Sequence, residues 1–209
     1  MLCYTLYEKE IEKGNSMQLQ DHMNLANILW KYFDIKASKG CKLAFILGSI
    51  EPDINFITYF RGSMKHEKMR GHNYDNVISH MGKLISKIQM STKQVLKYYK
   101  LGKLIHYVAD SFTFPHNKEF TGNLEEHCRY EDVLHLYMDK YLLGEYKGLD
   151  KNKNENLLNE IKRLHNKYVG SIRNYYEDCY YIVNVSIMVM KDLIKELENE
   201  EFINISKVA

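Results

Sequence analysis

The sequence predicts an all-α protein, a single domain over residues 1–209 folded as a multi-helix bundle. Apolar residues recur at spacings of three and four over long stretches, which is the pattern of amphipathic helices. No stretch combines sustained apolar–polar alternation with glycine-marked turns, as strands would. Only two residues are proline and 45% are hydrophobic, so a chain of this length can bury a substantial core.

The first two predicted helices lie near the start of the chain. Residues 18–37 carry apolar side chains along one helical face, and residues 39–47 form a second, short apolar segment. We expect Gly48 to end this second helix. Pro52 then predicts a loop over residues 48–53, because a proline disfavours helical backbone in the residue before it.

Two further helices are predicted in the middle of the chain. Residues 59–72 are polar and irregular, whereas residues 73–88 show helical spacing. Ser91 or Thr92 can cap a long helix that reaches about residue 112, because their side-chain oxygens can accept hydrogen bonds from the first amides of a helix.

The rest of the chain completes the predicted bundle. Residues 124–143 form one helix, and a charged linker over residues 150–156 separates it from helices over residues 157–169 and 176–197. The run 182–190 is mostly apolar, and we expect it to lie in the core.

The net charge does not indicate a class of partner, whereas the targeting signals bear on where the protein is located. The net charge is +2 and no long basic run occurs, so electrostatics argues neither for nor against nucleic acid. The chain starts without an apolar signal segment, and no apolar run approaches the roughly 18 residues of a membrane span. We therefore expect a cytoplasmic protein. Its cysteines have no CxxC spacing and should stay reduced there; they are Cys3, Cys41, Cys128 and Cys179.

The most informative residues are two pairs spaced four apart, His106/Asp110 and His127/Glu131, with His116 between them. Side chains at this spacing share one face of a helix, so each pair can close on one metal ion. A single pair of this kind is more often a surface interaction. Here both pairs are flanked by apolar residues, and burying these charged groups without a metal would be costly. Imidazole and carboxylate ligands suit zinc in hydrolytic sites, so the pattern predicts a metallohydrolase.

Three further ligand-type residues precede these pairs. His22 lies near the start of the first predicted helix, Asp53 follows Pro52, and His72 opens the segment Gly-His-Asn-Tyr-Asp. Each of these residues alone is weak evidence for a metal site, because a lone histidine or a Pro-Asp turn is common.

The order of all eight residues resembles the zinc-dependent bacterial phospholipase C family, which includes the phosphatidylcholine-preferring enzyme of bacilli and the catalytic domain of clostridial alpha-toxins. The segment from His72 to Asp75 is similar to the family's His-aromatic-aromatic-Asp segment, which favours His72 over His66 or His80. Residues 48–53 are similar to its Gly-x(3)-Pro-Asp loop. The motifs cover residues 22–131, and the all-α character covers the whole chain.

The resemblance implies three zinc sites. One would be formed by Asp53, His72, His106 and Asp110, and a second by His116, His127 and Glu131. A third would use His22 and a bridging Asp110. The family completes this third site with an N-terminal Trp, whereas residue 1 here is Met and the only Trp is Trp30. Leu2 should protect Met1 from removal, so we expect two tightly bound zinc ions and a third only in excess zinc. The lipid-binding β-sandwich of the alpha-toxins is also expected to be absent.

The implied activity is phosphodiester hydrolysis by metal-activated water. Asp110 would act as a bridging ligand, and the sequence leaves open whether Asp53 is a ligand, a general base or both. The substrate class is a phosphodiester. A phospholipid, with transient membrane contact, follows from the resemblance alone, and nucleic acid is the less expected substrate.

Two alternatives stay open at this point. A zinc-dependent single-strand nuclease shares the same ligand pattern, and Phe56, Tyr59 and Phe60 could stack bases. The second alternative is a non-catalytic helical domain that a metal ion stabilises. Phosphohydrolases with adjacent His-Asp and di-iron bundles with Glu-x-x-His are excluded, because neither motif occurs in the chain.

Overall fold

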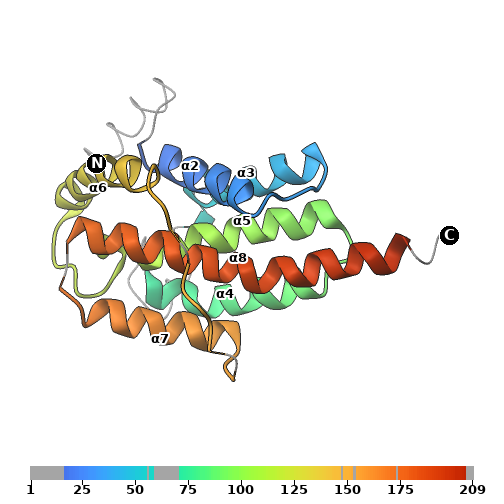
Figure 1. Ribbon diagram of the computed structural model, residues 1–209. Helices are drawn as coiled ribbons and strands as arrows, with labels where there is room; N and C mark the ends of the chain where they lie inside the picture. Colours follow the sequence, from blue (N-terminus) through green and yellow to red (C-terminus); the bar gives the residue numbers. More distant parts are fainter. Residues whose placement is uncertain are drawn as a thin grey trace.

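The computed structural model describes residues 17–55, 57–58, 71–146, 148–152, 154–172 and 174–205, with side chains described between residues 19 and 194. Within this part of the chain all regular structure is helical and no strand occurs, so the all-α prediction is confirmed. The elements, labelled as in Figure 1, are α2 (Met17–Tyr32), α3 (Lys39–Ile54), α4 (Tyr74–Gln89), α5 (Gln94–Ser111), the 3-10 turn η2 (Phe114–His116), α6 (Leu124–Tyr141), α7 (Leu157–Val169) and α8 (Tyr175–Ile205).

Helices α5 and α8 pack together in the middle of the bundle (Figure 1). Helix α3 packs on α5 and is joined by α2 on one side, while α4 and α7 lie on the other side. Helix α6 lies at one end, against α2 and α8. Because α5 touches α2, α3, α4, α8 and η2, its side chains can meet residues from most of the fold.

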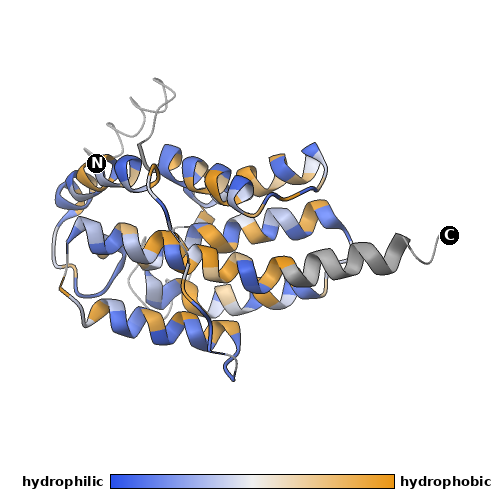
Figure 2. Ribbon diagram, in the orientation of Figure 1, coloured by the Kyte–Doolittle hydropathy of each residue, from blue (hydrophilic) through white to orange (hydrophobic). Residues whose placement is uncertain are grey.

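The second half of α5 is buried on almost every side. Leu104, Ile105 and Val108 are each at most 1% exposed, as expected of a helix in the core rather than at a surface. Full burial of each such aliphatic side chain contributes roughly 1.5–3 kcal/mol. Figure 2 shows hydrophobic residues concentrated along α5, α8 and the faces packed on them. The apolar run 182–190 of α8 is buried, as predicted.

Helix α3 contradicts the prediction that Gly48 ends a helix and that residues 48–53 form a loop. The helix continues through Gly48 and Pro52 to Ile54. A side-chain carbon on Gly48 would overlap the backbone carbonyl of Tyr99, and one on Gly102 would overlap that of Phe45. Glycine at these positions therefore lets α3 and α5 cross in backbone contact. This tertiary packing outweighs the local helix-breaking tendency of Gly and Pro.

The first predicted helix was extended too far, since α2 ends at Tyr32 rather than at residue 37. Asp34 has a left-handed backbone with φ 47°. The amide of Asp34 donates to Lys31 O at 3.0 Å, and the amide of Ile35 donates to Trp30 O at 3.3 Å. This is the Schellman arrangement that closes a helix. This helix end has no sequence signal, because the left-handed position holds Asp34 instead of the usual Gly.

The other helices agree with the prediction to different degrees. Helix α4 lies within one residue of its predicted range, α7 matches it, and α6 ends two residues early. The predicted Ser91 or Thr92 cap is wrong, because Lys93 is the capping residue of α5 and its side chain makes no capping bond. Helix α8 extends to Ile205, beyond residue 197. The expected irregular segment 59–72 lies mostly outside the described residues.

The cysteines within the described residues are free thiols. Cys41 and Cys179 are buried and Cys128 is half-buried, whereas Cys3 lies outside the described residues. No group of possible metal ligands among the described residues includes Cys128.

Candidate metal centre

The structure gathers the eight candidate residues into two neighbouring groups. The central cluster contains His22 from α2, Asp53 from α3, His72 from the turn before α4, and His106 and Asp110 from α5. The α6 cluster contains His116 from η2 and His127 and Glu131 from α6. The rings of His72 and His116 stack with centroids 6.3 Å apart, so the two clusters are adjacent.

Two imidazoles and a carboxylate converge at the middle of the central cluster. Oδ2 of Asp110 lies 3.1 Å from Nδ1 of His72 and 3.1 Å from Nε2 of His106. These two nitrogens are 3.3 Å apart. Ligands about 2.0–2.2 Å from one tetrahedral zinc lie roughly 3.3 Å from each other. The three atoms therefore have the spacing of ligands that share one ion.

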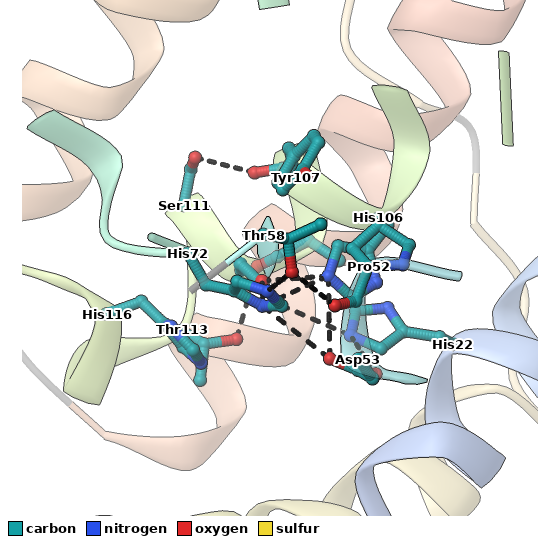
Figure 3. Close-up of polar contacts among 12 residues, drawn as sticks. His22, Pro52, Asp53, Thr58, His72, His106, Tyr107, Ser111, Thr113 and His116 are labelled. Carbon is teal, nitrogen blue, oxygen red and sulfur yellow. Dashed lines mark hydrogen bonds and ion pairs between the residues drawn. The ribbon is translucent and has the colours of Figure 1, made fainter. Parts of the chain in front are cut away.

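The remaining carboxylate oxygens, those of Asp110 and Asp53, lie beside the same imidazoles, and Figure 3 shows Asp53 next to His22, His72 and His106. Oδ1 of Asp110 lies 3.2 Å from Nε2 of His22, so the two oxygens of Asp110 face different imidazoles. Oδ1 of Asp53 lies 3.6 Å from Nδ1 of His72 and from Nε2 of His106. This geometry gives Asp110 the position of a bridging carboxylate and keeps Asp53 at the edge of the convergence.

Hydrogen bonds behind the imidazoles orient them. Nδ1 of His106 donates to the Ser49 carbonyl at 2.9 Å. Thr58 Oγ1 lies 3.0 Å from Nε2 of His72 and donates to the Pro52 carbonyl at 2.6 Å, so the His72 nitrogen is the donor to Thr58. Both carbonyl partners belong to the part of α3 that was predicted as a loop. The other ring nitrogens of His72 and His106 then face the Asp110 carboxylate, an arrangement that a bound cation stabilises.

The charges of the central cluster are strongly coupled. Burial raises the pKa of Asp110, but the His106 and His116 imidazoles hold it well below its usual range. Burial lowers the pKa of His22, but the hydrogen bond to Asp110 and the charge of Asp53 raise it to about 9. Burial lowers the pKa of His106. The Asp110 carboxylate is therefore ionised, whereas His22 holds a proton that a metal ion bound there would have to displace.

The α6 cluster is a second convergence on one carboxylate. Oε1 of Glu131 lies 3.0 Å from Nε2 of His116 and 3.0 Å from Nε2 of His127. Burial raises the pKa of Glu131, but the charge of His127 and the hydrogen bond from His116 lower it to about 2. The donor set and spacing fit a zinc ion here as well.

Asp178 of α8 fixes the segment that carries His116. Its Oδ2 accepts hydrogen bonds from the Phe114 amide at 3.1 Å and from the Tyr130 hydroxyl at 2.9 Å, and its Oδ1 accepts one from Tyr168 at 2.8 Å. Asp178 is fully buried. One carboxylate therefore joins η2, α6, α7 and α8 directly beside the α6 cluster.

A cavity of about 450 Å³ opens next to the α6 cluster. Its walls include Phe114, Phe120, Tyr130 and Tyr175, with Glu126 and Arg129 among its polar lining. The Phe120 ring lies 6.0 Å from the His127 ring, so the cavity is close to that ligand position.

The sequence interpretation also missed residues. A third group with ligand-type atoms, Asp21, His135 and Asp139, lies between α2 and α6. His135 and Asp139 have the same spacing as the recognised pairs, so the signal was present. Asp178 carried no such signal. His80 belongs to no group of possible metal ligands among the described residues, whereas His66, Phe56, Tyr59 and Phe60 lie outside those residues.

Comparison with known proteins agrees with the geometry. A family model described as zinc dependent phospholipase C matches residues 21–175, a span that includes all eight candidate residues. No curated protein and no solved structure gives a match. Among the described residues, no helix combines the length and apolar character needed to cross a membrane. With most of its length matched, the chain belongs to the zinc-dependent phospholipase C family.

Proposed function

We propose that this protein is a zinc-dependent phosphodiester hydrolase of the phospholipase C type that acts on phospholipid. The observation that carries the proposal is the convergence of His72, His106 and Asp110 within 3.1–3.3 Å in a buried site. Family membership supports the same substrate class. A buried set of lone pairs at this spacing has little structural use without a cation.

The proposed ligands form two tight sites and one weaker site. Asp53, His72, His106 and Asp110 would hold one zinc, and His116, His127 and Glu131 a second. His22 and Asp110 would hold a third only when zinc is in excess. Zinc bound by such ligands would act as a Lewis acid that lowers the pKa of a bound water and stabilises negative charge on phosphate oxygens.

The protein's own residues would supply positioning and proton transfer. Ser49 and Thr58 hold the imidazoles of His106 and His72 in the orientation described above. Asp53 lies farther from these imidazoles than Asp110 does, at 3.6 Å against 3.1 Å, which suits a carboxylate that takes a proton from the attacking water. The water oxygen bonds to phosphorus, the bond from phosphorus to the alcohol oxygen breaks, and that oxygen takes up a proton.

Burial of the centre strengthens these interactions, because His106 is completely buried and Asp110 is 4% exposed. Fixed charges in a water-poor site act more strongly on a developing charge than they would in water. We further propose that the aromatic-walled cavity beside His127 receives the part of the substrate beyond the phosphate.

The test compares phosphatidylcholine with single-stranded DNA under identical zinc concentrations. We expect hydrolysis of phosphatidylcholine that is lost in His106→Gln and kept in His80→Gln, a control that replaces a histidine outside both clusters. Faster cleavage of DNA would favour the nuclease alternative. No hydrolysis of either by zinc-loaded protein would favour a non-catalytic helical domain.

A second measurement separates the two roles of Asp53. If it accepts a proton, Asp53→Asn should lower kcat by about 100-fold or more while zinc content falls much less. A loss of zinc in proportion to the loss of rate would show that the ligand role alone is sufficient.

A further inference from the structure

A third group of ligand-type side chains lies outside both clusters. His135 and Asp139 of α6 meet Asp21 of α2, and one ligand atom from each lies within 4.8 Å of the others. None of these residues belongs to the ligand sets proposed above. We propose that they form a separate site for a divalent cation of the zinc class at the surface between α2 and α6.

Helix α6 repeats one ligand pattern along its length. His127, Glu131, His135 and Asp139 follow each other at intervals of four residues, so neighbours in this series share a face while the whole series winds slowly around the helix. The first two belong to the α6 cluster. The other two repeat a histidine–carboxylate pair about 12 Å further along the helix axis, at 1.5 Å per residue.

The atoms of this group are arranged like a metal ligand and the carboxylate that orients it. Nδ1 of His135 lies 2.6 Å from Oδ1 of Asp21, the separation of a charge-assisted hydrogen bond. When Nδ1 carries the proton, the lone pair of Nε2 is available on the side of Asp139. Oδ2 of Asp139 is 3.5 Å from Nε2, close to the roughly 3.3 Å between two ligands of one tetrahedral zinc. Asp21 then orients the histidine from behind.

The exposure of Asp139 distinguishes this site from the other two. The side chains of His135 and Asp21 are 16% and 21% exposed, and that of Asp139 is 54% exposed. Water can therefore complete the coordination of an ion held by His135 and Asp139. Two protein ligands at a solvent-accessible position bind more weakly than three or four buried ones, so this site should fill after the two main clusters.

Binding here would affect two helices that carry main-cluster ligands. Asp21 precedes His22 on α2, and His135 follows Glu131 by four residues on α6. An ion on His135 polarises its Nδ1–H bond to Asp21 and strengthens the connection between the helices. Excess zinc should therefore stabilise the folded protein through this site. Without a cation, the same residues would form only an ion pair of protonated His135 with two carboxylates.

The test is a zinc titration of the full chain after its chelator-resistant zinc has been loaded. We expect wild type to bind one more weakly held zinc than His135→Gln or Asp139→Asn, with equal chelator-resistant zinc in all three. His22→Gln should lose a different weak ion and keep this one. Asp21→Asn should retain the site with affinity lowered about 10–100-fold, the usual effect of losing an orienting partner.

Thermal unfolding gives a second readout. The rise in Tm caused by excess zinc should be smaller in His135→Gln and Asp139→Asn than in wild type. Asp139 is half-exposed, so Asp139→Asn carries the test even if His135→Gln does not fold. Equal zinc stoichiometry and equal zinc-induced Tm shifts in wild type and Asp139→Asn would overturn the proposal. Loss of chelator-resistant zinc in Asp139→Asn would also overturn it, because the site would not be separate.

Discussion

The central cluster and the α6 cluster contain similar ligand-type residues but are assembled in different ways. The central cluster takes its residues from three helices and one connecting segment, and its His106 side chain is fully buried. The α6 cluster uses one turn of α6 and the short η2, and the side chain of His127 is 21% exposed. The first therefore depends on how helices cross, and the second on how one short segment is held.

Different residues outside the clusters set the helix crossing in one case and hold the short segment in the other. Gly48 and Gly102 allow α3 and α5 to approach until Asp53 of α3 lies beside His106 of α5. Asp178 holds η2 against α6 and so sets the position of His116. The contrast predicts that each cluster can be damaged without the other.

Asp110→Asn should have the largest effect, because Asp110 faces the imidazoles of His72 and His106 with one oxygen and that of His22 with the other. We expect zinc affinity in the central cluster to fall by more than about 100-fold, beyond the effect of losing an orienting partner, and hydrolysis to fall with it. Zinc per chain after dialysis, measured by mass spectrometry, checks this. Glu131→Gln is the comparison variant and should lose the other ion. Unchanged zinc in Asp110→Asn would contradict the bridging role.

Gly102→Ala tests the helix crossing. The added carbon would overlap the Phe45 carbonyl, which cannot move without separating α3 from α5. We expect a loss of at least about 3 kcal/mol in the free energy of unfolding, measured in urea on zinc-free protein. Gly40→Ala is the control in α3, because its added carbon would meet only Ser38 Oγ at 3.7 Å. That variant should be neutral or slightly more stable. Similar losses in both variants would argue against a specific crossing.

Asp178→Asn tests the support of the α6 cluster. The amide keeps one acceptor oxygen but cannot accept from Phe114, Tyr130 and Tyr168 together. We expect about a 10-fold weaker α6-cluster zinc with the central zinc unchanged, measured by chelator competition. Tyr168→Phe removes a bond that does not involve η2 and should affect this zinc less. Equal weakening of both zincs by Asp178→Asn would show a general loss of stability instead.

Asp178 should also leave a pH signature. Burial raises the pKa of its carboxyl to about 6 from 3.8, against the lowering effect of its hydrogen bonds. Between these pH values the folded protein binds a proton that the unfolded chain releases, so the free energy of unfolding falls as pH rises through this window. Zinc-free wild type should show this decrease relative to zinc-free Asp178→Asn. Parallel pH profiles for the two proteins would rule out the raised pKa.

The features that could be predicted from the sequence are those set by local patterns, namely helix ranges and residue pairs at helical spacing. Helices α4 and α7 have strong apolar periodicity, and their predicted ranges lie within one residue of those observed. The pairs His106/Asp110 and His127/Glu131 are also local, since four-residue spacing on a helix is enough to bring them together. His135 and Asp139 have this spacing too and could have been recognised.

Tertiary contacts determined what the sequence could not predict. Gly48 and Pro52 have low intrinsic helix propensity. They lie within a helix because α3 packs closely on the backbone of α5. Asp178 lies 62 residues after His116 in the chain. No local sequence pattern links the two residues. Supporting residues of this kind become visible only when distant segments are placed together.

The smallest expected effect concerns the start of α6. The Asn123 side chain accepts from the Glu126 amide at 3.0 Å, and the Glu126 carboxylate accepts from the Asn123 amide at 2.7 Å, forming a capping box one turn before His127. Asn123→Ala should cost about 1 kcal/mol of stability. The backbone bond from the His127 amide to Asn123 O remains, so α6-cluster zinc affinity should fall by less than about 10-fold.

Asn156→Ala provides the matched control, because Asn156 caps α7 through the Asn159 amide at 2.9 Å and lies in neither cluster. It should lower stability by a similar amount and leave zinc affinity unchanged, as measured by urea unfolding and chelator competition. If the two variants weakened zinc binding equally, the α6 cluster would follow the overall stability of the fold. A selective effect of Asn123→Ala would instead show that this cluster depends on the order of its own short segment, as its assembly from one helix turn and η2 implies.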